Sequence, residues 1–207
     1  MAHLLHIDSS PRGDRSHTRR ISHEFVQAWK AEHPDETVTY RDLGHNPVPY
    51  IDEPWVAAAF TPPQEHTPEL QEAIRLSNEL IDEFLAADFY VFGVPMYNFG
   101  VPAVFKAYID QIVRVGRTFS FDANGYQALV HGKKMCILTA RGGGGYEPGG
   151  AMEAYNYEDP HLRAVFGFIG VTDINFIHLE NLNQGDEVLQ QSMIEASASI
   201  QKTVTSW

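Results

Sequence analysis

The sequence predicts an α/β fold with a doubly wound parallel sheet, and two features of the chain support this. Short apolar runs alternate with longer segments of helical pattern, as expected when parallel strands are joined by helical crossovers. The runs at 89–94 and 135–140 lack polar alternation, which is typical of central strands covered on both faces. Five strands are expected, at residues 3–7, 37–41, 88–94, 134–140 and 173–179.

Three helices stand out between and after these strands. The first follows "DRSHT", and its apolar stripe consists of Ile21, Phe25, Ala28 and Trp29. The second is expected over residues 67–87, with Thr67 as its N-cap and Pro68 at the first helical position. The last helix should begin after Gly185, and its inward-facing residues are expected to be Val188, Leu189, Met193, Ala196, Ile200 and Val204.

Two regions interrupt this alternation. Residues 44–63 carry five prolines, which favours an ordered surface excursion over a sheet element. Residues 117–131 begin with period-two apolar residues and continue into "DANG", a pattern that indicates a β-hairpin. Composition and length, 207 residues, favour a single domain covering 1–207.

Charge and composition exclude several classes of protein. The chain has 15 Lys and Arg against 27 Asp and Glu, a formal charge of -12, so neither nucleic acid nor an acidic membrane surface is an expected partner. The single cysteine, Cys136, lies in an apolar run and is expected to be a buried small hydrophobe. The start "MAHLLHID" does not resemble a signal peptide, and no apolar run is long enough to span a bilayer, so we expect a cytoplasmic protein.

The loop after the first strand, "SSPRGDRSHT" at 9–18, leads into a helix and is rich in hydroxyl groups. Free N–H groups and the dipole at the start of a helix favour an anion, so this loop is a candidate phosphate site. The alternative is that Ser16 or Thr18 only caps the helix. The loop matches neither a Walker loop nor a G-x-G-x-x-G fingerprint, so its sequence alone does not decide between the two.

Two further loops follow strands at the same edge of the predicted sheet. In "VPMYNFG", Met96, Tyr97 and Phe99 can lie against a flat ring and Asn98 can hydrogen-bond its edge, although these residues could instead contact a neighbouring loop or subunit. In "ARGGGGYEPGG", at 140–150, consecutive glycines let backbone N–H groups approach an acceptor, or simply make the loop mobile. Because ligands of doubly wound folds bind beyond the carboxyl ends of strands, the three loops together indicate a mononucleotide with a flat heterocycle, such as FMN.

The chain resembles the bacterial FMN-dependent NADH azoreductases, which also reduce quinones. The resemblance is carried by "SSPRGDRSHT", "PMYNF", "TFSFDANG", "GKK", "ARGG" and "GFIGVTD", and it extends over nearly the whole chain. It implies a flavodoxin-like fold with five parallel strands in the order 2-1-3-4-5 and helices on both faces. It also implies a homodimer with the flavin at the subunit boundary, with Phe168 and the 117–131 hairpin near the partner's site.

Matched position by position, the resemblance implies two sets of FMN contacts. The phosphate contacts fall on Ser10, Ser16, His17 and Thr18. The ring contacts fall on Met96, Tyr97, Asn98, Phe99, Ala140, Arg141, Gly142 and Gly143. Ala140 stands where family members often have serine, and the 142–157 segment, with Tyr146, Tyr155 and Tyr157 as candidate pocket walls, is longer than usual.

The implied reaction is ping-pong: NADH or NADPH delivers hydride to FMN, and a quinone or azo compound is then reduced. FMN supplies this chemistry, so we expect the chain to contribute positioning through Asn98 and charge stabilisation through the N–H groups of Gly142 and Gly143. None of the ten histidines fits a metal motif, and no metal is expected. The alternatives are a flavodoxin-type electron carrier that does not oxidise pyridine nucleotides, and an FAD quinone reductase, which would need room for an adenosine half.

Overall fold

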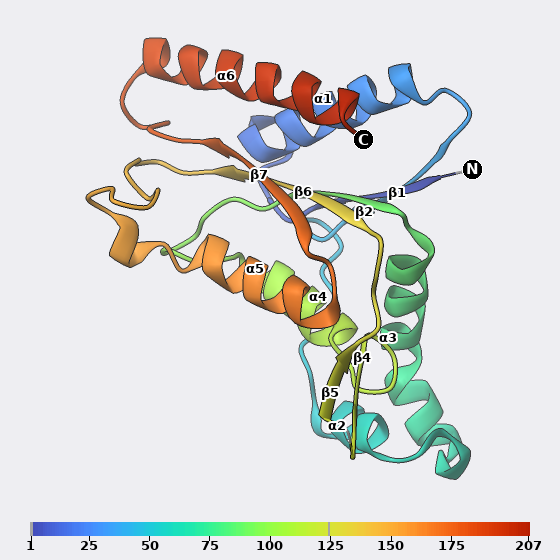
Figure 1. The fold of residues 1–207 in the computed structure, drawn as a ribbon. Helices are drawn as coiled ribbons and strands as arrows, with labels where there is room; N and C mark the ends of the chain where they lie inside the picture. Colours follow the sequence, from blue (N-terminus) through green and yellow to red (C-terminus); the bar gives the residue numbers. More distant parts are fainter. Residues whose placement is uncertain (1, 124) are drawn as a thin grey trace.

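Five parallel strands form one sheet in the computed structural model, which describes residues 2–123 and 125–207 (Figure 1). The strands are β1 (His3–Asp8), β2 (Thr37–Asp42), β3 (Phe89–Gly93), β6 (Lys134–Ala140) and β7 (Asp173–Leu179). Their order is β2-β1-β3-β6-β7, and every neighbouring pair is parallel. This is the expected order, with the numbers shifted by the two strands of a separate hairpin, β4 (Phe119–Asp122) and β5 (Gly125–Ala128).

Helices cover both faces of the sheet, as expected of a doubly wound fold. In Figure 1, α1 (His17–Glu32) and α6 (Asp186–Thr205) lie on one side. On the other side lie α3 (Pro68–Ala86), α4 (Ala103–Ile112) and α5 (Glu158–Ile169). Two apolar cores separate these helices from the sheet, one on each face. Residues of β3 alternate between the two cores, because successive side chains of a strand point to opposite faces.

The predicted helices are confirmed, and their apolar stripes are largely buried. Ile21, Phe25 and Trp29 of α1 are fully buried, whereas Ala28 is half-buried at the edge of the stripe. Thr67 caps α3 by accepting a hydrogen bond from the N–H of Leu70 at 3.4 Å. In α6, Val188 and Leu189 are only half-buried, and the inward-facing residues are Met193, Ala196, Ile200 and Val204.

Residues 44–63 contain no strand, as predicted, but they contain a helix that the sequence did not indicate. This helix, α2 (Glu53–Phe60), begins where the Asp52 carboxylate accepts a hydrogen bond from the N–H of Trp55 at 3.0 Å. A short 3-10 turn, η2 (Pro63–Glu65), then leads toward α3. Pro54 lies in the first turn of α2, where a proline does not break a helix.

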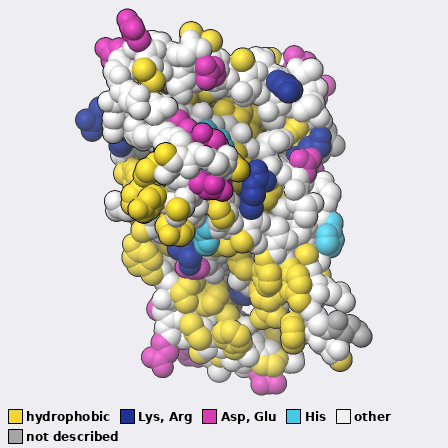
Figure 2. All heavy atoms as spheres, turned by 60° about the vertical axis from the view of Figure 1, so that its left-hand side comes forward, with side chains coloured by type: hydrophobic (Ala, Val, Ile, Leu, Met, Phe, Trp, Pro, Cys, Tyr) yellow, Lys and Arg dark blue, Asp and Glu magenta, His cyan; other side chains and the backbone are white. Residues whose placement is uncertain are grey.

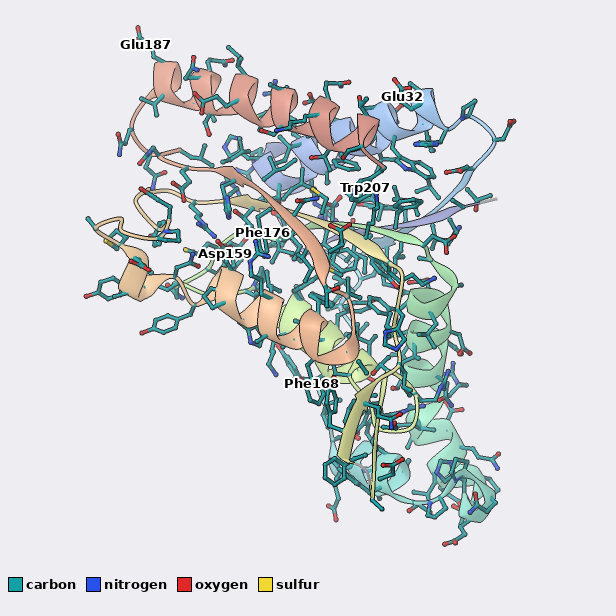
Figure 3. All side chains as sticks on the ribbon, in the orientation of Figure 1. Glu32, Asp159, Phe168, Phe176, Glu187 and Trp207 are labelled. Carbon is teal, nitrogen blue, oxygen red and sulfur yellow. The ribbon has the colours of Figure 1, made fainter. Side chains whose placement is uncertain are left out.

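The predicted hairpin is formed by β4 (Phe119–Asp122) and β5 (Gly125–Ala128), which pair antiparallel. Residue 124 of the "DANG" turn lies outside the described residues. The hairpin packs on the C-terminal end of α5, where the Tyr126 ring stacks on Phe168 at 4.3 Å between centroids (Figure 3). α5 ends at Gly170 in a left-handed conformation (φ 112°), and a Cβ there would collide with the carbonyl of Val130.

The C-terminal residue lies on the face of the sheet that α1 and α6 cover. The C-terminal Trp207 contacts Phe25 and Phe89, each at 5.1 Å between ring centroids (Figure 3). Cys136 is buried in the centre of the sheet, as expected, and burial raises the pKa of its thiol well above the usual value. Among the described helices, none is both long and apolar enough to cross a membrane.

Candidate cofactor site

The three candidate loops leave the sheet side by side. The N–H of Ser9, which starts the first loop, donates to the carbonyl of Gly93 at 3.0 Å. The N–H of Met96 donates to the carbonyl of Ala140 at 3.1 Å, which joins the second loop to the end of β6. The loops at 9–18, 94–102 and 140–150 therefore share one edge of the sheet.

The first loop presents buried hydroxyl groups at the N-terminus of α1. Ser10, Ser16 and Thr18 are between 0% and 4% exposed. Ser16 caps the helix by accepting from the N–H of Arg19 at 3.3 Å, and its hydroxyl lies 3.1 Å from that of Thr18. The N–H groups of His17 and Thr18 have no acceptor among the described residues. Capping and anion binding are thus compatible here, because the two free N–H groups remain for a ligand.

The Arg19 side chain fixes the backbone of this loop. Its Nε and Nη2 donate to the carbonyl of Ser10 at 2.8 and 2.7 Å, and it forms an ion pair with Asp42. Burial disfavours the charge on Asp42, but hydrogen bonds from Arg19 and His45 outweigh it and hold the pKa of Asp42 below its usual value. The sequence did not single out Arg19, because its partner Asp42 lies 23 residues away.

His17 stands in a positive environment at the start of the same helix. Burial, together with the nearby charges of Arg12 and Arg20, lowers the pKa of its imidazole. The neutral form is therefore favoured at neutral pH. Since the chain as a whole carries -12, these cations make the loop a local exception that suits a phosphate group.

The second loop is a tight turn over Tyr97–Gly100. Tyr97 and Gly100 exchange backbone hydrogen bonds of 2.8 and 3.1 Å, and the two residues between them have left-handed backbones: Asn98 (φ 48°) and Phe99 (φ 72°). Asparagine tolerates this conformation, whereas a phenylalanine in it is strained. Strain of this kind is concentrated at functional loops, where the surrounding structure maintains it.

A cavity and two tyrosines surround this turn. Tyr97 and Asn98 line a cavity of about 920 Å³ that also includes Lys106, Tyr157 and His161. The Phe99 ring lies 5.2 Å from the Tyr155 ring, and the carbonyl of Phe99 accepts from the N–H of Tyr157 at 3.1 Å. Phe99 therefore contacts a neighbouring segment of the same chain, which is one of the alternatives given for it above.

In the third loop, the backbone of residues 141–143 is fixed through its carbonyl groups. The carbonyls of Arg141, Gly142 and Gly143 accept from the N–H groups of Leu182, Asn183 and Asn181 at 3.2, 3.1 and 2.9 Å. The N–H groups of Gly142 and Gly143 have no acceptor among the described residues. This arrangement leaves two adjacent N–H groups without a protein acceptor, and their role as donors to a ligand stays a prediction.

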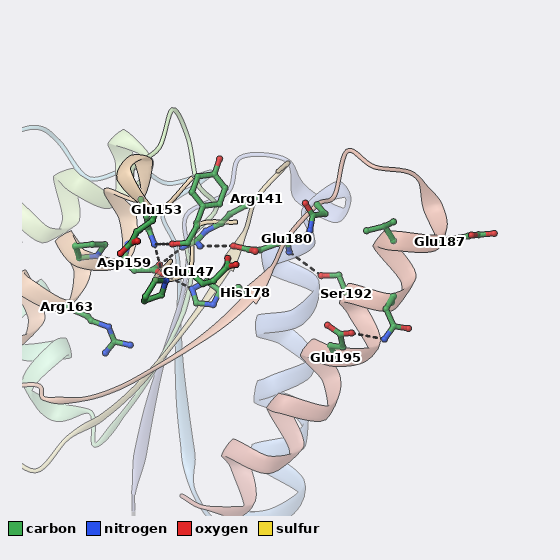
Figure 4. Close-up of a pocket in the computed structure, with 17 residues that line it drawn as sticks. Arg141, Glu147, Glu153, Asp159, Arg163, His178, Glu180, Glu187, Ser192 and Glu195 are labelled. Atoms are coloured by element: carbon green, nitrogen blue, oxygen red, sulfur yellow. Dashed lines mark hydrogen bonds and ion pairs between the residues drawn. The ribbon is translucent and has the colours of Figure 1, made fainter. Parts of the chain in front are cut away.

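The Arg141 side chain is only 2% exposed and is held in an ion cluster (Figure 4). It pairs with Glu158, Asp159 and Glu180, and its guanidinium lies 5.3 Å from the centre of the Tyr146 ring. Any contact of this residue with a flavin would therefore involve its backbone. No sequence pattern indicated these three carboxylates. The acidic pair at the start of the helix at 158 was the available signal, and it indicates only a helix start.

Five of the remaining expected residues lie in or beside these loops, and the sixth, Phe168, lies at a distance from them. Met96 is half-buried and Ala140 ends β6, so both border the shared edge. Tyr146 is nearly buried, whereas Tyr155 and Tyr157 are 49% and 63% exposed. Phe168 is 41% exposed and lies with the hairpin near the C-terminal end of α5, at the end of that helix away from the loops. Among the described residues, no group of three or more His, Cys, Asp and Glu side chains could hold a metal ion.

The donor set of this edge fits FMN. Buried hydroxyls with free helix N–H groups suit a terminal phosphate, and the turn at Tyr97–Gly100 with the paired glycine N–H groups suits the polar edge of a flat ring. The two parts belong to loops that follow β1, β3 and β6, which are neighbours in the sheet.

The fold and this loop arrangement define a flavodoxin-like protein, and the model of the family described as "Flavodoxin-like fold" matches residues 2–204. Among similar curated proteins, the FMN-dependent NADH:quinone oxidoreductase 2 of Trichormus variabilis is 62% identical over 208 residues, covering 100% of both chains. The FMN-dependent NADH:quinone oxidoreductase of Nostoc punctiforme is 60% identical over 207 residues, again covering the whole of this chain and of its own. The chain belongs to this family of FMN-dependent NADH:quinone oxidoreductases.

Solved structures agree with this assignment. The crystal structure of azoreductase AzrA superimposes with a TM-score of 0.91 at 26% identity, covering 100% of both chains. An FMN-dependent NADH-azoreductase from Bacillus anthracis, solved in complex with FMN, gives a TM-score of 0.85 at 26% identity, covering 98% of this chain and 99% of its own.

Proposed function

We propose that this protein is an FMN-dependent oxidoreductase that transfers two electrons from NADH or NADPH to a quinone or an azo compound. The observation that carries the proposal is the convergence of two sets of free backbone donors, at His17–Thr18 and at Gly142–Gly143, on one edge of the sheet. The family relationship supports FMN as the cofactor, because relatives of 60% identity or more over the full chain are named as FMN-dependent NADH:quinone oxidoreductases.

The proposed FMN contacts are those expected from the sequence. The hydroxyls of Ser10, Ser16 and Thr18, with the N–H groups of His17 and Thr18, hold the phosphate. The ring lies against the Met96–Phe99 turn and the backbone of residues 140–143, with the Asn98 amide at its edge. The arrangement of these groups around one sheet edge supports this assignment.

In the proposed reaction, NADH and a proton reduce a quinone to a quinol and leave NAD⁺. FMN, when bound, supplies the hydride chemistry by a ping-pong sequence. The chain contributes donors that are already in place: the N–H groups of Gly142 and Gly143 would stabilise the charge of the reduced ring, and Asn98 would fix the orientation of the ring. Fixed donors of this kind stabilise developing charge without having to reorganise.

We further propose a single FMN-binding domain over residues 1–207 that acts as a homodimer. One sheet spans the chain from β1 to β7, and Trp207 packs against Phe25, which supports one folding unit. An apolar groove of about 780 Å³ runs along α2, α4, α5 and the hairpin, and Figure 2 shows hydrophobic side chains gathered in the lower part of that face. A second copy covering this groove would bring Phe168 and the hairpin to the subunit boundary. The cytoplasmic location expected from the sequence stays a prediction.

One experiment tests the function and separates it from the alternatives. The purified protein is denatured, and the released flavin is identified by mass. The holoenzyme is then mixed anaerobically with NADH, and the flavin absorbance at 450 nm, roughly its visible maximum, is followed before and after a quinone or azo dye is added. Bleaching by NADH and recovery on adding the acceptor are expected. A holoprotein that stays yellow with both NADH and NADPH would instead indicate a flavodoxin-type electron carrier. Released FAD would indicate an FAD quinone reductase.

A further inference from the structure

The third loop poses a mechanical problem, because its two donors belong to the most flexible residue type. Arg141 is the last residue with a side chain before four consecutive glycines. Glycine has no side chain to fix it and loses more conformational freedom on ordering than any other residue. The donors of Gly142 and Gly143 can therefore act as a fixed anion site only if neighbouring groups hold their backbone.

The backbone itself supplies one of these restraints. The three carbonyls of residues 141–143 are bound by the segment 181–183 that follows β7. These hydrogen bonds orient the peptide planes, but they connect one exposed loop to another: Asn183 is exposed and Asn181 is only half-buried. A second restraint is needed, from elements that are themselves part of the packed fold.

Arg141 provides that restraint through three different nitrogen atoms. Nε and Nη2 donate to Glu158 Oε2 at 3.2 and 3.1 Å, Nη2 also binds Asp159, and Nη1 donates to Glu180 Oε1 at 3.0 Å. The carboxylates come from the first turn of α5 and from the end of β7, so the guanidinium joins two elements to the loop. Because its fork is planar and rigid, three acceptors in different directions fix its position and its rotation.

The partners of Arg141 are themselves held in place. Asp159 accepts from His178 Nε2 at 2.9 Å and from Asn156 Nδ2 at 3.1 Å, and the N–H of Glu180 donates to Ser192 at 3.2 Å. Figure 4 shows Arg141 directed toward Asp159 and Glu180, with His178 beside them. A buried cluster of this kind adds little net stability, because the charges lose their hydration, so its main effect is on geometry.

We propose that Arg141 is a positioning residue, which holds the N–H groups of Gly142 and Gly143 where they stabilise the negative charge of reduced FMN. The inference rests on the proposed function. The Arg141 side chain touches neither the reacting atoms nor the acceptor; it acts through the two glycines that follow it. Its loss should therefore affect reduced FMN, which carries the charge, more than oxidised FMN, which does not.

The test uses charge-conserving variants, so that a change of geometry is not confused with a change of charge. Lysine has one nitrogen in place of the rigid fork that binds through Nε, Nη1 and Nη2, so Arg141→Lys loosens the loop and leaves the net charge unaltered. We expect the dissociation constant of reduced FMN to rise about tenfold more than that of oxidised FMN, which lowers the midpoint potential by about 30 mV. In the protein without FMN, the amide hydrogens of residues 181–183, which donate to the carbonyls of residues 141–143, should exchange faster than in wild type.

Matched controls separate this effect from general destabilisation. Arg163 is exposed, lies on α5 and, like Arg141, lines a cavity of about 1000 Å³, so Arg163→Lys should leave the potential and the exchange of the amides at 181–183 at wild-type values. If Arg141→Lys does not fold, Glu180→Asp is the second variant. It shortens the side chain that accepts from Arg141 Nη1, at a position where that side chain is 24% exposed. This variant should lower the potential in the same direction by a smaller amount.

The outcomes discriminate between the two proposals. An Arg141→Lys protein that binds FMN with the wild-type potential, and in which the amides of residues 181–183 exchange as in wild type, would overturn the positioning role while leaving the proposed function intact. Equal weakening of both redox forms, with no change in potential, would also reject it, because it would indicate a purely structural role. A wild-type protein that takes up no FMN would overturn the proposed function and, with it, this inference.

Discussion

At the scale of single residues, Asn98 combines a backbone role with a side-chain role. Its φ of 48° requires a residue that tolerates the left-handed region, and its amide lines the cavity beside the turn. Asn98→Ala removes both features, so we expect a loss of about 1 kcal/mol in the free energy of unfolding and weaker FMN binding. Urea unfolding and quenching of FMN fluorescence on binding measure the two effects.

Asn98→Gly separates the two roles, since glycine keeps the turn and removes only the amide. This variant should retain most of the stability and still bind FMN more weakly than wild type. FMN affinity at the wild-type level in Asn98→Gly would contradict the ring-edge role, whatever the alanine variant does.

The raised pKa of Glu158 predicts that the free energy of unfolding depends on pH, which can be measured without a cofactor. Burial raises the pKa of its carboxyl group to about 8, against the opposing effect of Arg141, and Asp159 adds to the rise. His178 and Glu180 complete the set of ionisable groups in the cluster. As the pH rises from about 5 to about 8, the unfolded chain ionises this group before the folded protein does, so stability is lost over this window.

Glu158→Gln cannot ionise and should not show this loss. The free energy of unfolding of wild type minus that of the variant should therefore fall between about pH 5 and about pH 8, and level off above that. Chemical unfolding at closely spaced pH values measures the difference. Parallel curves for the two proteins would contradict the assignment of a raised pKa to Glu158.

At the scale of an element, the N-terminus of α1 serves both helix stability and phosphate binding. Ser16→Ala removes the side-chain acceptor of the Arg19 N–H, so we expect a loss of about 1 kcal/mol in stability. FMN affinity should fall as well, because the Ser16 hydroxyl is one of the proposed phosphate ligands. Thr67→Ala is the matched control, since Thr67 caps α3 away from the three loops. It should lose similar stability with unchanged FMN affinity, and equal losses of affinity would argue against a phosphate at Ser16.

The elements that the sequence predicted are those whose residues carry their own signal. The strands 134–140 and 173–179 match the structure, since their apolar runs do not depend on distant partners. The helices α2, α4 and α5 were not predicted. α2 and α4 have only 8 and 10 residues, and α2 begins among prolines that also indicate a turn. For α5, the acidic start at 158 was present but not recognised as a helix signal.

The candidate site divides in the same way. The loops that contain Ser16, Asn98 and Gly142 were found because parallel strands bring their carboxyl ends to one edge. The groups that hold those loops were missed, because they are tertiary contacts. Arg141 meets Glu180 across 39 residues and Glu158 across 17, distances at which a sequence pattern carries no information. The positive φ of Phe99 was missed for a related reason, since the surrounding structure rather than the residue type maintains it.

At the scale of the whole molecule, apolar surface and charge are distributed unevenly. Phe60 and Phe121 are 77% and 73% exposed, and both line the groove between α2, α4, α5 and the hairpin. A chain with a formal charge of -12 would repel a second copy unless an apolar area brought the two together. The proposed dimer depends on this groove, so a charge placed there should be far more damaging than a charge elsewhere on the surface.

Phe121→Glu places a carboxylate in this groove, and we expect it to weaken the dimer by about tenfold or more, because the charge would be buried without a partner. Sedimentation over a range of protein concentrations measures the change. Ile194→Glu is the matched control: Ile194 is 63% exposed on α6, which covers the opposite face of the sheet, so this variant should sediment as wild type. If the flavin lies at the subunit boundary, FMN content should fall with dimer content in Phe121→Glu. A Phe121→Glu protein that remains dimeric would place the interface on another face, and a monomeric wild type that retains FMN and turns over would show that one chain completes the site.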